Sequence, residues 1–355
     1  MAKIDALFKI LRDQGGSDLH ISPDNPPLIR VSGSLKPAIS QVLTGPQCQA
    51  LLYEIMTDAQ KDTFEQTRDL DFAYEVPALK ARFRANIFGG RLGTGAVFRI
   101  IPTEILTAEQ LGLPDVVLRF TEHKKGLVLV TGPTGSGKST TLAAMIDHVN
   151  RTRNEHILTI EDPIEFVHIS QKSLVNQREV GCHTLSFAAA LKAALREDPD
   201  IILVGEMRDL ETIELAITAA ETGHLVFGTL HTSSAAKTVD RIINVFPTNQ
   251  QEQIRTMLAE SLKGVVAQQL PRTLEGKRCA AMEILSVTPA VANLIREGKT
   301  FQIPSIIQTG RNEGMQLMDQ ALMQLVQEKR IAAEEAYRFA VNKAQFAPLL
   351  QGRPA

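Results

Sequence analysis

The first hundred residues combine helical and strand periodicity. Apolar side chains recur at helical spacing over residues 4–11, and the pair Gly15-Gly16 ends this predicted helix. One or two further helices are predicted over 47–66, and a turn at 32–34. Alternating or short apolar runs predict five strands, at 19–21, 28–31, 70–76, 81–88 and 94–101. Within 81–88 the odd-numbered positions are apolar, whereas the other face carries Arg82, Arg84 and Asn86. We therefore expect a small sheet with helices on one side.

The pattern changes at Gly126. Short apolar runs alternate with helical stretches, which predicts a parallel sheet covered by helices. The expected strands are 127–130, 157–160, 201–204 and 225–229, and the expected helices are 140–150, 187–196 and 210–222. After about residue 269 the chain turns mainly helical, most clearly at 289–297, 315–328 and 333–340. Between the two parts, Pro102 and Pro114 frame a boundary, and residues 111–114 are expected to form an irregular connector.

Composition narrows the class of protein. A length of 355 residues predicts about two domains. Lys plus Arg total 38 against 40 for Asp plus Glu, and this net charge of −2 disfavours a protein that coats nucleic acid. Neither a signal peptide nor an apolar run long enough to span a bilayer is present, so we expect a cytoplasmic protein that meets a membrane only through partners. Cys48, Cys182 and Cys279 are far apart, which disfavours both a zinc site and a disulfide framework.

The strongest chemical signal is the octapeptide Gly132–Ser139, Gly-Pro-Thr-Gly-Ser-Gly-Lys-Ser. It has the full spacing of a phosphate-binding loop, with a predicted strand before it and a predicted helix after it. Lys138 is expected to reach the β- and γ-phosphates, and the Ser139 hydroxyl to bind Mg²⁺. The expected nucleotide-binding residues are Gly132, Pro133, Thr134, Gly135, Ser136, Gly137, Lys138, Ser139 and Thr140.

Two acidic clusters follow predicted strands. Residues just past the carboxyl ends of parallel strands face the ligand crevice of an open sheet. Glu206 lies there in a Walker B position, although Gly-Glu replaces the usual Asp, and we expect it to bind Mg²⁺ directly or through water. Glu161 and Glu165 compete for activating the attacking water; from the residues alone, any of these acids could instead be a helix cap or a solvated loop charge.

A histidine stands at each end of the predicted strand over 225–229. His231 falls at the carboxyl end, where it could sense the γ-phosphate, and His224 falls at the opposite end. A lone histidine is more often structural, and a metal site made by this pair is disfavoured because opposite strand ends separate them.

Together these motifs resemble those of the secretion-ATPase superfamily of type II secretion and type IV pilus systems. The match comprises Gly132–Ser139, an acidic box at 159–165, the atypical Walker B segment 198–206 and a histidine box at 222–231. The chain is most similar to the retraction-ATPase branch, a likeness that extends over nearly its whole length. It includes the segments 16–20, 175–179, 196–200, 205–209 and 314–316. Assembly ATPases typically carry an extra N-terminal domain and a four-cysteine zinc motif, which this chain lacks.

The resemblance implies an α/β fold in four parts. These are a PAS-like α+β domain over 1–101, a linker over 102–125, a RecA-like P-loop ATPase core over 126–270 and a mainly helical part over 271–355. It also implies that each subunit binds ATP, with Mg²⁺, between its two domains. The subunits are implied to assemble into a homohexameric ring.

The resemblance also assigns roles to residues. Glu165 matches the catalytic glutamate and Glu206 the Walker B acid, and the N-terminal sheet supplies arginines to the triphosphate, for which Arg82, Arg84 and Arg99 are the candidates. A solvated strand face is an equally good explanation for each arginine.

One segment departs from the family pattern. Retraction ATPases carry Ala-Ile-Arg-Asn-Leu-Ile-Arg-Glu where this chain has 290–297 with Ala292 in place of the first arginine. We expect ATPase activity to survive this change, because the segment is remote in sequence from the nucleotide motifs.

The function that the resemblance implies is a motor that hydrolyses ATP to power pilus retraction and twitching motility, docked at the inner membrane on a pilus platform protein. A paralogue of the retraction motor is a further candidate partner. The alternatives are a paralogue with an auxiliary or regulatory role, an assembly or secretion ATPase, and a nucleic-acid translocase, which the near-neutral charge disfavours.

Overall fold

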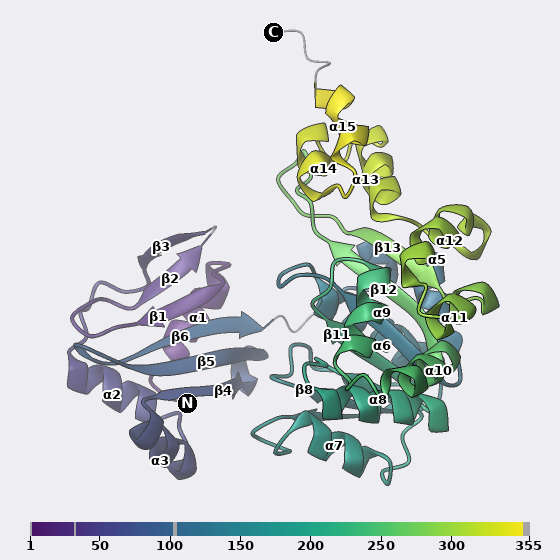
Figure 1. Ribbon diagram of the computed structural model, residues 1–355. Coiled ribbons are helices and arrows are strands. Elements are labelled where there is room, and N and C mark those ends of the chain that lie inside the picture. The colour runs from purple at the N-terminus through teal and green to yellow at the C-terminus, as the bar shows by residue number, and fades with distance from the viewer. Residues whose placement is uncertain (1, 32, 102–104, 351–355) are drawn as a thin grey trace. The chain divides into compact units, whose positions relative to one another are not determined.

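The computed structural model describes residues 2–31, 33–101 and 105–350, and it divides into two compact units. The first comprises residues 1–104 with 163–167, and the second comprises 105–162 with 168–355 (Figure 1). Part of the turn predicted at 32–34, and Pro102 of the predicted boundary, lie outside the described residues. None of the helices described is both long and apolar enough to cross a membrane.

The first unit is an antiparallel sheet with helices. Its strands are β1 (Asp18–Ile21), β2 (Leu28–Val31), β3 (Ser34–Pro37), β4 (Asp69–Val76), β5 (Ala81–Gly90) and β6 (Gly93–Ile101), in the order β3-β2-β1-β6-β5-β4. Its helices are α1 (Asp5–Asp13), α2 (Gly45–Tyr53) and α3 (Asp58–Thr67), and η1 (Pro77–Leu79) joins β4 to β5. The predicted helices and strands of this unit are present, and β3 is an additional, exposed strand.

Alternation in the strands explains the core of this unit. On β5 the odd-numbered side chains from Ala81 to Ile87 are buried, as the pattern predicted. Phe8 of α1 stacks on Phe83 with ring centroids 4.0 Å apart. The opposite face of β5 carries Arg82, Arg84 and Asn86, followed by the exposed Phe88. The first unit thus has one apolar sheet face and one face that carries charges of both signs, such as the paired Arg82 and Glu75.

The second unit is built around a seven-stranded sheet in the order β13-β12-β7-β11-β10-β8-β9. The strands are β7 (Gly126–Thr131), β8 (His156–Glu161), β9 (Leu174–Glu179), β10 (Ile201–Val204), β11 (Leu225–Leu230), β12 (Leu262–Gln269) and β13 (Ala281–Ser286). Every neighbouring pair is parallel except β12 and β13. The predicted α/β class with a parallel sheet is confirmed, whereas β9, β12 and β13 are strands that the apolar pattern did not indicate.

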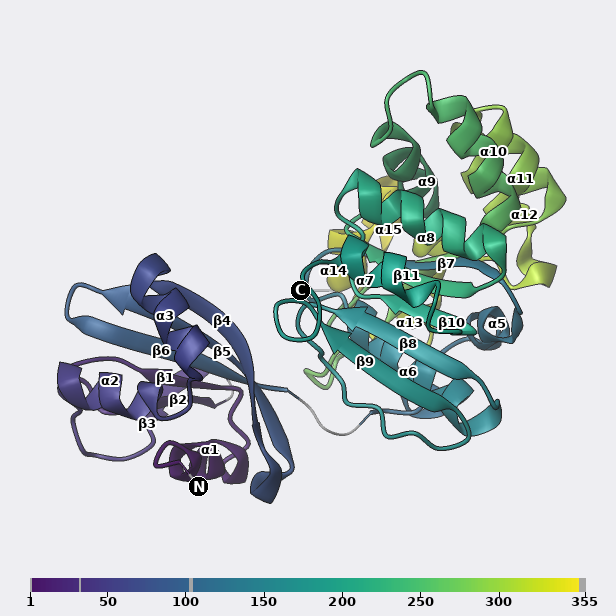
Figure 2. The same ribbon diagram turned by 90° about the horizontal axis from the view of Figure 1, so that it is seen from below.

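Helices cover both faces of this sheet (Figure 2). The helices of this unit are α4 (Ala108–Leu111), α5 (Asp115–Arg119), α6 (Lys138–Thr152), α7 (Phe187–Ala194), α8 (Leu210–Thr222), α9 (Ala235–Asn244), α10 (Gln251–Ser261), α11 (Pro289–Arg296), α12 (Ile303–Thr309), α13 (Met318–Gln327), α14 (Ala333–Phe339) and α15 (Lys343–Leu350). Short 3₁₀ turns are η2 (Phe120–Glu122), η3 (Thr300–Gln302) and η4 (Arg311–Glu313).

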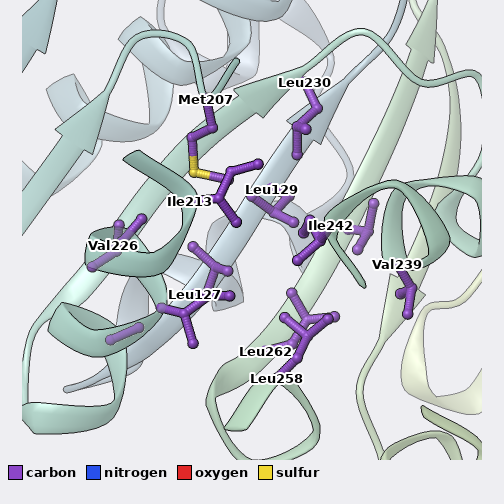
Figure 3. Packing of buried hydrophobic residues seen from close by; sticks show 14 of the residues in the cluster. Leu127, Leu129, Met207, Ile213, Val226, Leu230, Val239, Ile242, Leu258 and Leu262 are labelled. Carbon is purple, nitrogen blue, oxygen red and sulfur yellow. The ribbon is translucent and has the colours of Figure 1, made fainter. Parts of the chain in front are cut away.

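The central strand β7 shows why both sheet faces are apolar. Leu127 and Leu129 point to one core cluster, together with Met207, Ile213 and Leu258 (Figure 3). Val128 and Val130 belong to a second cluster with residues of α6. All six residues of β7 are buried, which is typical of a strand that has helices on both sides.

Residues 105–125 are more regular than the connector predicted there. Gly112 ends α4 in the left-handed conformation, with a φ of 63°, and Pro114 precedes α5, so only a short turn separates the helices. Val117 and Phe120 are buried in the core cluster that contains Val128. Apolar packing thus makes this stretch part of the second unit, whereas the linker was expected to extend to residue 125; residues 102–104 are outside the described structure.

Candidate nucleotide-binding site

Parallel strands bring the predicted motifs to one edge of the sheet. The phosphate-binding loop follows β7, Gly205-Glu206 follows β10 and His231 follows β11. The register pairs Thr131 with Leu230 and Val204 with Gly228, so these loops leave the sheet side by side. His224 precedes β11, at the opposite end, as expected. The second unit therefore gathers its candidate chemistry at the carboxyl edge of the sheet.

Three positions of the loop have backbone conformations that favour glycine. Gly132, Gly135 and Gly137 have φ values of 143°, 80° and 86°. A Cβ on Gly132 would lie 2.4 Å from the carbonyl oxygen of Gln268, and one on Gly137 would lie 2.8 Å from the Gln268 Nε2. The end of β12 therefore packs directly beneath the loop, and Gln268 also accepts a hydrogen bond from Thr141 Oγ1 of α6 at 2.8 Å.

The loop has polar groups that suit a phosphate ligand. Ser136 is only 2% exposed, and its Oγ has no hydrogen-bond partner among the residues described. Lys138 Nζ donates to the carbonyl oxygens of Gly132 (2.9 Å) and Pro133 (3.2 Å), within the loop that it is expected to serve. Ser139 and Thr140 follow, half-buried in the first turn of α6. A buried orphan hydroxyl, a glycine cradle and a helix N-terminus together fit a nucleotide triphosphate.

Glu206 is at the centre of a hydrogen-bonded group at this edge. Its Oε1 lies 2.6 Å from Arg208 Nε and 2.8 Å from His231 Nε2, and Arg208 Nη2 donates to its Oε2 at 2.6 Å. Burial raises the pKa of Glu206, but the hydrogen bonds and charge of Arg208, and then those of His231, outweigh burial and hold that pKa below its usual range. The structure thus joins Glu206, the candidate Walker B acid, to His231, which could sense the γ-phosphate.

The two carboxylates of the acidic box differ in setting. Glu161, the last residue of β8, accepts hydrogen bonds at its Oε1 from Thr159 Oγ1 (2.6 Å) and Gln177 Nε2 (3.2 Å). Glu165 lies exposed in the irregular segment that follows, within residues 163–167, which group with the first unit. The two candidates for activating the attacking water therefore differ in structural setting: Glu161 is bound into the sheet and Glu165 is on a loop.

The three candidate arginines share the outer face of the first unit's sheet. Arg84 of β5 and Arg99 of β6 are directly opposite each other, and Arg82 is two residues away from Arg84. Arg99 Nε donates to Asp18 Oδ1 at 2.9 Å, and Asp18 is 4% exposed. Like charges opposite each other repel, so Asp18 offsets the cost of the Arg84–Arg99 pair.

Sequence reasoning missed the partners of the predicted residues. Arg208, Gln268, Thr141 and Asp18 each bind a candidate residue or brace its loop. Only Arg208 and Asp18 had a signal, because both fall within segments that carry the family resemblance. Of the cysteines, Cys182 is exposed and Cys48 and Cys279 are buried, and all three are free thiols.

Comparison with known proteins decides the family. Residues 2–347 match the family described as type II/IV secretion system protein. The chain belongs to this family. It is 57% identical over 333 residues to the type IV pilus retraction ATPase PilT of Pseudomonas aeruginosa, covering 94% of this chain and 96% of that protein. It is 56% identical over 317 residues to a twitching motility protein of Neisseria gonorrhoeae, covering 89% of this chain and 84% of that protein.

A solved structure agrees with the sequence relatives. The crystal structure of the pilus retraction motor PilT with bound ADP matches at a TM-score of 0.91 and 45% identity, over 97% of this chain and 98% of that one. The family, the complete phosphate-binding loop and this likeness identify the chain as a nucleotide-binding ATPase.

Proposed function

We propose that this chain is the hexameric motor that hydrolyses ATP to drive retraction of a type IV pilus. The observation that carries the proposal is the complete phosphate-binding loop within a chain that is 57% identical, over nearly its full length, to a pilus retraction ATPase. The role in twitching motility rests on the second relative, which is named for it.

The phosphates would be held by residues 132–140. Loop amides and Ser136 Oγ would bind phosphate oxygens, and Lys138 would exchange its two loop carbonyl partners for the β- and γ-phosphates. Ser139 and Glu206 would hold Mg²⁺. When bound, this ion neutralises charge that develops on the phosphate oxygens. His231, bonded to Glu206, would register whether the γ-phosphate is present.

Hydrolysis requires a group that orients or deprotonates the attacking water, and we assign this role to Glu165. Glu161 is bound into the end of β8, whereas Glu165 lies exposed on the loop that follows, which favours Glu165 for contact with a water molecule. Arg82, Arg84 and Arg99 would stabilise charge on the transferred phosphoryl group, because a guanidinium is permanently charged and forks onto phosphate oxygens.

The division into two units supports a mechanical cycle. Each subunit would bind a nucleotide at the phosphate-binding loop of its second unit, and hydrolysis there would drive a conformational change of the subunit. In a ring of subunits, coordinated changes of this kind would act on a pilus platform protein at the cytoplasmic face of the inner membrane, where the chain is held through this partner.

ATPase assays test the chemistry. Lys138→Ala and Glu165→Gln are each expected to lower turnover at least about 100-fold, because they remove phosphate binding and water activation respectively. Turnover at the wild-type level in either variant contradicts the site assignment.

The auxiliary-paralogue alternative is favoured by one observation, Ala292 of α11, which stands where the family has arginine. A pilus-retraction assay in a deletion strain separates the two functions, with Ala292→Arg beside the unchanged chain. Retraction by the unchanged chain supports the motor. Retraction only with Ala292→Arg supports an altered paralogue, and restored piliation in an assembly mutant supports an assembly ATPase.

A further inference from the structure

The connection between β8 and β9 carries Glu165 and contains no helix. The two strands are parallel neighbours at the edge of the sheet (Figure 2), with Glu161 paired to Glu179. Parallel pairing obliges the chain to travel back from the carboxyl end of β8 to the amino end of β9. It does so through residues 162–173, which are irregular throughout.

The returning half of this connection lies along β9. Gln177 Oε1 accepts a hydrogen bond from the backbone N–H of His168 at 2.7 Å, and Ser170 Oγ accepts one from the backbone N–H of Val175 at 3.0 Å. From His168 to Ser170 the residue number rises, whereas the partner changes from Gln177 to Val175, so the two segments run in opposite directions. Residues 168–173 therefore form an arm that runs antiparallel to β9.

The same Gln177 also holds the outgoing end of the connection. Its Nε2 donates at 3.2 Å to the Oε1 of Glu161, the last residue of β8. One side chain thus joins the residue just before the segment 162–167 to the residue just after it. That segment is the part of the connection that contains Glu165.

Other contacts fix the arm beyond that point. His168 is 7% exposed, and burial lowers its pKa to about 4, so its ring is a neutral anchor. Asn150, near the end of α6, donates to the carbonyl oxygen of Ile169 at 2.8 Å and accepts from the N–H of Gln171 at 2.9 Å. The arm is thereby attached to the helix that begins at Lys138.

We propose that Gln177 is a positioning residue for Glu165. Its amide closes the base of the segment 162–167, so that the segment presents Glu165 in one place. Closing this base takes one acceptor, for the His168 N–H, and one donor, for the Glu161 carboxylate, and an amide has both. A glutamate lacks the donor and an aliphatic side chain lacks both. This inference rests on the role proposed above for Glu165.

Steady-state kinetics on the full-length chain test the proposal. In Gln177→Glu the bond to Glu161 is replaced by repulsion, and in Gln177→Met, which has a similar volume, both bonds are lost. Each variant is expected to lower kcat about 10-fold or more, because a displaced catalytic group is costly, and to leave KM for ATP within about two-fold. The matched control is Asn176→Asp, the same amide-to-acid change one residue away, where the amide contacts His156; its kcat is expected to stay within about two-fold of wild type.

A double variant distinguishes positioning of Glu165 from general support of the fold. If Gln177 acts through Glu165, adding Gln177→Met to Glu165→Gln lowers kcat less than about two-fold further. A full additional 10-fold loss of kcat overturns the proposal. It is also overturned if Gln177→Met fails to fold, which a strongly lowered melting temperature and the absence of folded enzyme with reduced kcat would show. Wild-type kcat in both Gln177 variants, with Glu165→Gln inactive, overturns this inference alone. Wild-type turnover in Glu165→Gln instead overturns the proposed site chemistry.

Discussion

At the scale of single residues, the Glu206 cluster makes a prediction about pH. The pKa of Glu206 is lowered in the folded chain, so its ion pairs stabilise the fold above the unfolded-state pKa, about 4.3, and this stabilisation disappears as pH falls through the folded-state value. Glu206→Gln is expected to lower the free energy of unfolding by about 1 kcal/mol at pH 7, with the difference closing below about pH 4. Urea denaturation at both pH values measures it.

The control for Glu206→Gln is the same change at an exposed pair. Glu275 lies 3.8 Å from Lys277, and both side chains are more than three-quarters exposed, at 78% and 81%. Glu275→Gln is expected to change stability negligibly at either pH, because exposed ion pairs contribute little. A loss in Glu206→Gln that persists at low pH would mean that the cost comes from packing rather than from charge.

The site residues that could be predicted are those whose spacing within a short segment of the sequence reveals their role. Residues 132–139 can be recognised from the sequence because the glycines, the lysine and the serine have fixed spacing within one loop. The side chains that brace them are distant in sequence: Gln268 bonds to Thr141 across 127 positions, and Asp18 to Arg99 across 81. Spacing carries no information about such pairs, because folding alone brings them together.

At the scale of elements, a buried carboxylate joins two helices. Glu283 of β13 is 6% exposed, and it accepts from the first N–H of α9, at Ala235 (2.8 Å), and from the first N–H of α13, at Met318 (3.4 Å). Burial raises the pKa of Glu283, which the two N–H bonds only partly offset. Glu283→Ala is expected to lower the free energy of unfolding by about 2–4 kcal/mol, because two buried donors lose their acceptor.

Hydrogen exchange, measured by NMR or mass spectrometry, tests the effect of Glu283→Ala on each of the two helices separately. The amides of Ala235 and Met318 are both expected to exchange faster in Glu283→Ala. Ser234→Ala is the control, because Ser234 Oγ caps only α9, through Lys237 N at 3.3 Å, and should cost about 1 kcal/mol without affecting Met318. Unchanged exchange at Met318 in Glu283→Ala would show that the carboxylate does not couple the two helices.

The strands that the sequence did not predict have physical explanations. β12 begins at Leu262, directly after α10 ends at Ser261, so no turn residue separates a helical pattern from a strand. β9 is an edge strand that reads Leu-Val-Asn-Gln-Arg-Glu, and its pairing with β8 compensates for a sequence with few apolar residues. The predicted strands β7, β8, β10 and β11 lie inside the sheet, where burial on two faces produces continuous apolar runs.

At the scale of the whole molecule, the proposed ring predicts how mixtures of subunits behave. If hydrolysis passes from subunit to subunit in a coordinated order, one inactive subunit stalls its neighbours. Co-expressing equal amounts of wild type and Lys138→Ala is then expected to leave roughly one-tenth or less of wild-type ATPase activity, whereas independent subunits would retain about half. The control mixture uses Glu275→Gln, whose exposed ion pair lies outside the candidate site, and should keep full activity. If activity instead falls in simple proportion to the fraction of inactive subunits, each site hydrolyses ATP independently. That result would contradict coordinated hydrolysis around the ring, even though the site chemistry would stand.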